Sequence, residues 1–443
     1  MKFFTLYAAL LLVLSQPYFT VADDQATLVP IVNYLLNHKA ATKYPPDTSF
    51  TSIPTDTTLA CPGYLHATTG TVFGNKITRL SDYPDVQVNF PYPKTPSFNR
   101  DGRLLMLTNR LLDARTYQTI ADQTWWDDDE KKWSATQPNI YYAMEHNYDL
   151  DGDGINDHAF VRRDVTPVLN HTATVPDREQ LIVFSGKNYR PTNDAYWFTL
   201  GHYEGNIDHQ DRYVVFSARK KDTNYLTAIV FDIRQGQVIA QKDMTDIAWV
   251  DDNGDQIFDW ISISPSGRYI LINWIKDPDN PSSVFRGAID QYDLHLNFIR
   301  ELAHQGQHGD IGVQANGRDM YVQFEFGTRN GIWGYDLESG QETQLLPDKY
   351  NGGHVSCRNY GRPGWCYLST TAEGYREVFA LKLDGSGTVN RFAQTRQTTW
   401  NSEGGVNADG TKIIFLSDWN ATTAVDSQGN HVHETFVVEV EQN

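Results

Sequence analysis

A short unit, a turn followed by a strand, recurs along this chain and constrains its fold more than any other feature. In each copy a polar turn with Gly or Asp precedes a basic residue and then an alternating run of apolar residues. Copies begin near residues 98, 209, 264, 315, 360 and 407. From 209 onward the spacing is about 45 to 55 residues, which is typical of the blades of a β-propeller.

The interval between the first two copies is about twice as long, so we expect one degenerate unit around residues 150 to 165. Six visible units and this one predict an all-β fold, a seven-bladed β-propeller, because one blade cannot bury both of its faces alone. A β-sandwich with irregular insertions is the alternative. A helical pattern after the N-terminal stretch is limited to a short candidate at 28–38, and no linker composition divides residues 23–443, which we expect to form one domain.

Charge and targeting signals restrict the function. The net charge of −18 argues against a nucleic-acid partner, because binding to phosphates depends on Lys and Arg. Residues 1–22 combine Lys2, an apolar stretch and Val21-Ala22, as a secretory signal peptide does. No later segment reaches the roughly 20 apolar residues that a membrane span needs. We therefore expect an exported monomer, secreted or periplasmic, with no membrane partner.

An acidic loop has carboxylates at positions 1, 3, 5 and 9, the spacing of a Ca²⁺ loop. These are Asp149, Asp151, Asp153 and Asp157. Position 12 is Phe160 rather than Glu, so the loop does not belong to a helix-loop-helix hand. A similar spacing recurs at 251–259, where Gln256 replaces the turn glycine. The loops predict structural calcium, with a solvated acidic hairpin as the alternative.

One imidazole and two thiols gather in the unit that begins near residue 353, and a further histidine opens the preceding unit. Together they make a possible tetrahedral set for structural zinc. The set is His308, His354, Cys357 and Cys366. The alternative is a disulfide between the two cysteines, which an oxidising compartment favours. Either interpretation leaves Cys61 as the odd thiol.

Several polar side chains are placed to converge at one mouth of a propeller's central channel. His202 and Tyr203 open one unit, and Arg219 closes its next strand. His158 lies in an apparent strand, and His146 precedes the acidic loop. Together they predict chemistry on a sugar acid: Arg neutralises a uronate carboxylate, neutral His accepts the C5 proton and Tyr protonates the leaving O4. For any one of the histidines, a structural role is the alternative.

Three runs in the last third of the chain are more specific than the repeats. They are Gly353–Ser369, Glu377–Gly387 and Asn407–Asn420. They resemble the secreted β-propeller polysaccharide lyases that degrade ulvan, and the similarity extends from about residue 69 to the C-terminus. The resemblance implies seven blades, β-elimination beside a uronic acid, and a zinc held by His and Cys. It also implies Tyr203 and Arg219 as the Tyr and Arg, and His158 as the histidine, with His202 and His146 in reserve.

Substrate and competing functions follow from these features. Arg358, Arg362 and Arg376 are candidate cations for binding an acidic polysaccharide. The predicted function is therefore a lyase for a uronate-containing, ulvan-like polysaccharide. One alternative is a non-catalytic, calcium-dependent propeller that binds glycans or proteins. Another is a hydrolase or a pectate-type lyase with a catalytic metal.

Overall fold

The computed structural model describes most of the chain from residue 47 onward. The described residues are 47, 50, 52–86, 92–107, 110–122, 129–189, 198–220, 223, 225–248, 257–274, 288–306, 308–326, 329–347, 352–372, 374–398 and 403–440. The chain divides into two compact units, Met1–Ala40 and Ala41–Asn443, and all described residues belong to the second. The expected signal peptide and the short helix at 28–38 lie outside the described residues.

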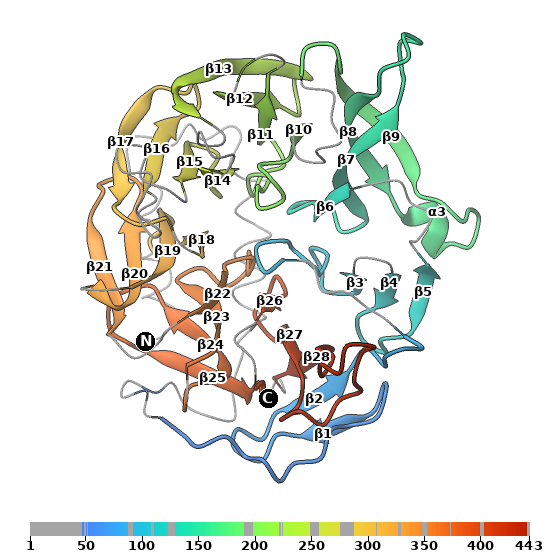
Figure 1. Ribbon diagram of the computed structural model, residues 1–443, viewed down its shortest axis with the longest axis vertical. Coiled ribbons are helices and arrows are strands. Elements are labelled where there is room, and N and C mark those ends of the chain that lie inside the picture. The colour runs from blue at the N-terminus through green and yellow to red at the C-terminus, as the bar shows by residue number, and fades with distance from the viewer. Residues whose placement is uncertain are drawn as a thin grey trace, which may run out of the picture. The chain divides into compact units, whose positions relative to one another are not determined.

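Seven antiparallel sheets stand around a common centre in this part of the chain, which confirms the predicted seven-bladed β-propeller (Figure 1). Five blades are four-stranded, with strands in sequence order from the inside outward. They are β6 (Asp129–Trp133), β7 (Ile140–Tyr148), β8 (Asp157–Asp164) and β9 (Asp177–Phe184); β10 (Phe198–Thr199), β11 (Tyr213–Arg219), β12 (Tyr225–Asp232) and β13 (Gln237–Ala248); β14 (Phe258–Ile263), β15 (Tyr269–Trp274), β16 (Ile289–Asp293) and β17 (Phe298–Ala303); β18 (Gly309–Val313), β19 (Asp319–Glu325), β20 (Gly331–Asp336) and β21 (Glu342–Pro347); and β22 (Gly353–Ser356), β23 (Trp365–Thr370), β24 (Glu377–Lys382) and β25 (Val389–Gln394). The β6–β9 blade is the predicted degenerate unit.

The two remaining blades complete the ring. One consists of β3 (Leu104–Leu107), β4 (Arg110–Asp113) and β5 (Thr119–Asp122). The other has the order β26 (Gly404–Val406), β27 (Lys412–Ser417), β28 (Glu434–Glu439), β2 (Lys76–Arg79) and β1 (Ala67–Thr69). In this blade β28 pairs with β2, so strands from the two ends of the described chain share one sheet. This pairing leaves β28 with a neighbour on both edges.

The core lies between neighbouring blades. β19 is buried along its whole length, because the flat faces of a blade pack against the blades on either side. Phe324 of β19, Leu368 of β23 and Phe379 of β24 belong to one apolar cluster that joins two blades. The alternating apolar residues of the repeat therefore serve packing within the ring.

The repeated turn has a simple physical basis, shown by residues 407–412. The side-chain oxygen of Asn407 accepts the backbone N–H groups of Thr411 and Lys412 at 2.9 and 3.0 Å. Gly410 has a φ of +74°, and a Cβ there would meet the Tyr367 hydroxyl at 1.9 Å. Only glycine fits both constraints at residue 410, whereas the copy of the turn at 209–213 has Asp211 with a φ of +52°.

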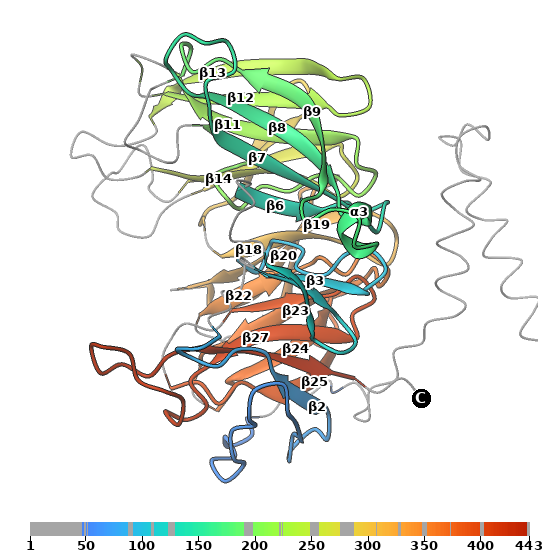
Figure 2. The same ribbon diagram turned by 90° about the vertical axis from the view of Figure 1, so that its right-hand side faces the viewer.

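Strand direction alternates within a blade, so every blade has the same two ends. We call the end at which the innermost strand begins the upper face, and the end at which it turns into the second strand the lower face. Figure 2 shows the blades from the side, with their strands running between the two ends. Besides the strands, the described residues include the single-turn helix α3 (Thr166–Leu169) after β8. None of the helices among them is long and apolar enough to cross a membrane.

Candidate active site

His146 and His158 meet at the upper end of the β7–β8 hairpin. Their Nδ1 atoms are 2.8 Å apart, so one ring donates a hydrogen bond to the other. His158 is 1% exposed, and burial, followed by the neighbouring His146, lowers its pKa to about 3. The ring is therefore neutral at ordinary pH, which is the form that a base needs, although such a low pKa makes it a weak base.

The histidine pair contacts the neighbouring β10–β13 blade through one aromatic ring. The ring of Phe198 stacks on that of His158, with centroids 5.4 Å apart. Phe198 pairs with Ala218 in the β10–β11 ladder, and Arg219 follows Ala218 as the last residue of β11. Because side chains alternate along a strand, the Arg219 side chain lies on the opposite face of this sheet from Phe198, the face that carries its partner Leu226. The structure thus brings the histidine pair and the end of β11 to the border between two blades, on the upper face.

His202 and Tyr203 lie in a loop that interrupts the innermost strand of the β10–β13 blade. The β10–β11 pairing stops at Thr199 and resumes only at Ile207. His202 and Tyr203 have φ angles of +59° and +68°, in the left-handed region that side chains other than Gly rarely adopt. Tyr203 is on the same blade as Arg219, as expected, and its backbone is in a strained conformation.

The segment 92–97, just before the β3–β5 blade, contributes side chains that the sequence analysis missed. The ammonium of the buried Lys94 is 2.6 Å from a carboxylate oxygen of Glu204 and 3.7 Å from the ring centroid of Trp260. The Tyr92 hydroxyl is 2.8 Å from Nδ1 of His308. No local pattern reveals these contacts, because the hydrogen-bonded partners are 110 and 216 positions apart in the chain.

Two carboxyl groups at the upper ends of β14 and β26 have raised pKa values. Burial, followed by the nearby Glu204, raises the pKa of Asp259 to about 8. Burial raises the pKa of Glu403 to about 7. Desolvation favours the neutral form of an acid, so burial keeps both groups protonated to a higher pH than an exposed carboxyl group.

The prediction that two cysteines bind zinc is wrong. Cys357 and Cys366 form a disulfide, the alternative considered from the sequence, so neither sulfur is a thiolate ligand. The expectation that His308 and His354 meet is confirmed, since their ring centroids are 4.7 Å apart. Cys61 is the remaining free cysteine, and burial raises its pKa to about 11, which makes it a poor nucleophile.

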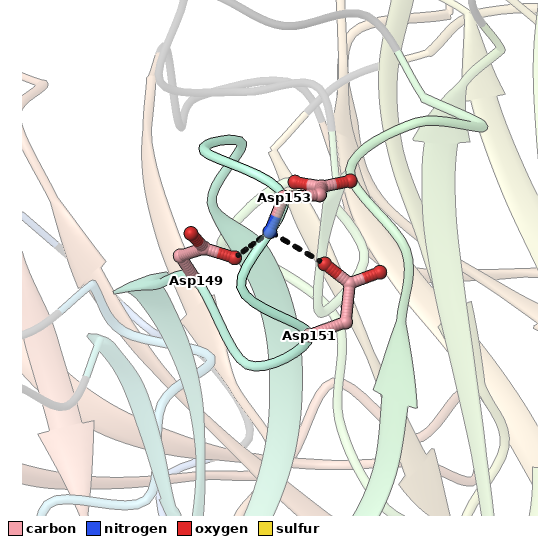
Figure 3. A group of neighbouring side chains, drawn as sticks. All are labelled: Asp149, Asp151 and Asp153. Carbon is pink, nitrogen blue, oxygen red and sulfur yellow. Dashed lines mark hydrogen bonds between the residues drawn. The ribbon is translucent and has the colours of Figure 1, made fainter.

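Three of the four predicted calcium ligands converge on the upper face. Asp149, Asp151 and Asp153 each offer an oxygen within 4.8 Å of the others (Figure 3). Lys187 forms ion pairs with two of these carboxylates. Asp157 does not join the group: it is 4% exposed and accepts the backbone N–H of Leu150 in its own hairpin and that of Gly186 after β9. Calcium at the first three carboxylates stays a prediction, and residues 251–256 of the second loop lie outside the described residues.

The three arginines proposed for substrate binding have different surroundings. Arg358 does not fit that role, because it is 3% exposed and its Nη2 is 2.7 Å from Asp310. Arg362 lies on the lower face, between β22 and β23, and donates to the Tyr367 hydroxyl at 2.7 Å. Arg376 lies on the upper face, between β23 and β24, where it donates to backbone carbonyls. Of the three, Arg376 is thus on the same face as the histidine pair.

No family model and no curated protein sequence gives a match to this chain. Solved structures do match. Two oligogalacturonate lyases, one in complex with manganese and one from Vibrio parahaemolyticus, align with TM-scores of 0.55 and 0.53 at 14% and 12% identity. Each alignment covers 85% of this chain and 96% of the lyase. The chain therefore has a β-propeller fold whose structural neighbours include polysaccharide lyases.

Proposed function

We propose that this protein is a secreted polysaccharide lyase that cleaves a uronate-containing, ulvan-like chain by β-elimination. The observation that carries the proposal is the His146–His158 pair on the upper face, where His158 stacks on Phe198 of the neighbouring blade and Arg219 ends β11 of that same blade. Tyr203 lies on the same blade. The similarity of the fold to two oligogalacturonate lyases supports the reaction class.

Each side chain has a distinct task in this reaction. Arg219 pairs with the uronate carboxylate and so stabilises the negative charge that develops when C5 loses its proton. The His146–His158 pair accepts that proton, and the two rings can share it through their hydrogen bond. The C4–O4 bond then breaks, a double bond forms between C4 and C5, and the Tyr203 phenol gives its proton to O4. His202 is the second candidate base, because it precedes Tyr203 in the same loop.

The unsaturated uronate product absorbs in the ultraviolet, which gives a direct test. The protein is incubated with ulvan and, separately, with polygalacturonate, and absorbance is followed alongside Tyr203→Phe and Arg219→Ala. We expect a rising trace with at least one substrate, and a loss of about 10²-fold or more in each variant without a large change in melting temperature. A flat trace on both polymers and on other polyuronates would refute the lyase.

One observation favours a second candidate, a non-catalytic glycan-binding propeller. The carboxylates of Asp149, Asp151 and Asp153 converge on the upper face. Retention on an immobilised polysaccharide that requires Ca²⁺, without release of unsaturated product, would select this function over the lyase.

A further inference from the structure

We propose that Glu130 and Lys132 of β6 are positioning residues that set the orientation of Tyr203 from the neighbouring blade. The inference rests on the proposed function, because it assigns these two side chains a role in the proton transfer by Tyr203. β6 and β10 are the innermost strands of adjacent blades (Figure 1).

The two side chains hold the peptide groups on both sides of Tyr203. Glu130 accepts the N–H of Tyr203 at 2.9 Å through one carboxylate oxygen and that of Leu200 at 3.0 Å through the other. Lys132 donates to the carbonyl of Tyr203 at 3.1 Å and to the hydroxyl of Thr95 at 2.7 Å. A carboxylate and an ammonium thus bind the donor and the acceptor of one residue, in a stretch where the strand ladder is interrupted.

The backbone conformation shows that the loop needs such support. Gly201, His202 and Tyr203 all have positive φ angles, of +64°, +59° and +68°. A Cβ on Gly201 would meet the carbonyl oxygen of Ile261 at 2.0 Å, so the loop is pressed against the β14–β17 blade. Consecutive left-handed residues persist only where their surroundings determine the conformation, and such strain gathers at functional sites.

β6 is itself deformed in a way that serves these contacts. Its pairing with β7 shifts register between Asp129 and Lys132, and Glu130 inside the shift has a φ of +50°. A bulge of this kind turns a side chain away from its regular direction. Two irregular innermost strands in adjacent blades therefore meet through hydrogen bonds to charged groups.

Burial makes these contacts strong and specific. Glu130 is 8% exposed and Lys132 is 1% exposed, so neither charge is solvated well and each depends on its protein partners. Glu204, the residue after Tyr203, is also held by a charged partner, because its carboxylate pairs with Lys94 at 2.6 Å. Three charged side chains from two other parts of the ring thus fix residues 200–204, and a shift of even 1 Å in Tyr203 would misplace its hydroxyl for proton transfer.

Kinetics in two backgrounds separate positioning from general stability. Glu130→Gln and Lys132→Met are made in the wild-type chain and in Tyr203→Phe. Matched controls are Glu434→Gln and Lys412→Met. Glu434 is a buried carboxylate that, like Glu130, accepts a backbone N–H, and Lys412, like Lys132, donates to a backbone carbonyl. We expect kcat to fall at least 30-fold in both test variants, with KM changed less than threefold. The same substitutions should change kcat less than threefold when Tyr203 is Phe, and Lys132→Arg should restore part of the rate. The controls should keep kcat within twofold.

Hydrogen exchange supplies a readout that does not need activity. Lys132→Met should accelerate amide exchange in a peptide that spans 198–207, and Lys412→Met should not. A kcat loss of equal size in the wild-type and Tyr203→Phe backgrounds would overturn the inference, as would unchanged exchange in this peptide. If the wild-type chain cleaves no polyuronate, the proposed function and the catalytic role of the two residues fail together, while the exchange result still decides whether they hold the loop.

Discussion

The Nδ1 atoms of His146 and His158 lie 2.8 Å apart, on adjacent strands of one hairpin at the upper face of the ring. Because each neutral imidazole carries one N–H, this contact fixes which nitrogen of one ring is protonated and leaves the Nε2 of the other ring protonated. The protonation states of the two rings are therefore coupled through this hydrogen bond.

His158→Ala should lower kcat on the cleaved polyuronate by about 10²- to 10⁴-fold, the usual contribution of a general base. The exposed His295, on the lower face between β16 and β17, provides the control variant His295→Ala, which should keep its rate. Initial rates by ultraviolet absorbance and melting temperatures decide the point. Equal rates for the two variants would show that His158 is a packing residue.

Arg219→Ala should lower kcat/KM by about 10²- to 10³-fold on a uronate polymer, because the carboxylate charge is then not neutralised in the transition state. Methyl esterification removes that charge from the substrate, so the penalty should shrink several-fold on an esterified polymer. Arg219→Lys should recover part of the activity, since Lys keeps the charge but cannot bind bidentately. A penalty that is the same for free and esterified substrate would contradict this role.

Glu403→Gln should stabilise the protein more at alkaline than at acid pH. Burial raises the pKa of Glu403 from 4.5 to about 7, so the folded state binds more protons than the unfolded state between these values. This difference in proton binding favours the folded state fully below pH 4.5, and the contribution is lost as the pH rises through 7. The variant should therefore gain roughly 1–2 kcal/mol over wild type at pH 8.5 and little at pH 5. Denaturant midpoints at both pH values test this, with the exposed Glu338→Gln as the control; a gain at pH 5 alone would contradict it.

The disulfide predicts how the protein responds to reductant and chelator. Removing the Cys357–Cys366 link by replacing both residues with Ala should cost roughly 2–3 kcal/mol, because the closed loop is short. A reductant should lower the melting temperature of the wild type but not of the double variant. EDTA should not change the difference in stability between the wild type and the double variant. If EDTA destabilised the wild type relative to the double variant and the reductant did not, the two cysteines would be metal ligands and not a disulfide.

The blades could be predicted from the sequence because each one is encoded locally. A turn such as 407–412 is held by its own Asn and Gly. The strand that follows it is only six residues long, so its alternating faces are also set by neighbouring residues. Among the candidate site residues, His158 lies in the expected strand and Arg219 ends the expected one, whereas Tyr203 lies in a loop that interrupts its strand. The contacts between the blades could not be predicted, because Lys94 and Glu204 are 110 positions apart and nothing near either one indicates the other.

The burial of charged residues is the least predictable from the sequence. The run 127–132 has the composition of a solvated acidic and basic stretch, yet Glu130 and Lys132 are buried against the Tyr203 loop. Arg358, a predicted substrate-binding cation, is instead enclosed with Asp310. In both cases the packing of adjacent blades, and not the local sequence, determines whether the charged group is solvated or paired.

The sheet shared by β2 and β28 gives the protein a defined order of assembly. Lys76 and Glu439, which face each other across that sheet, are 363 positions apart, so six blades can be synthesised before the partner of β2 exists. The sheet that closes the ring can therefore be completed only after residues 434–439 have been synthesised. Fusions or deletions placed at that strand should impair closure more than equal changes in any loop on the lower face.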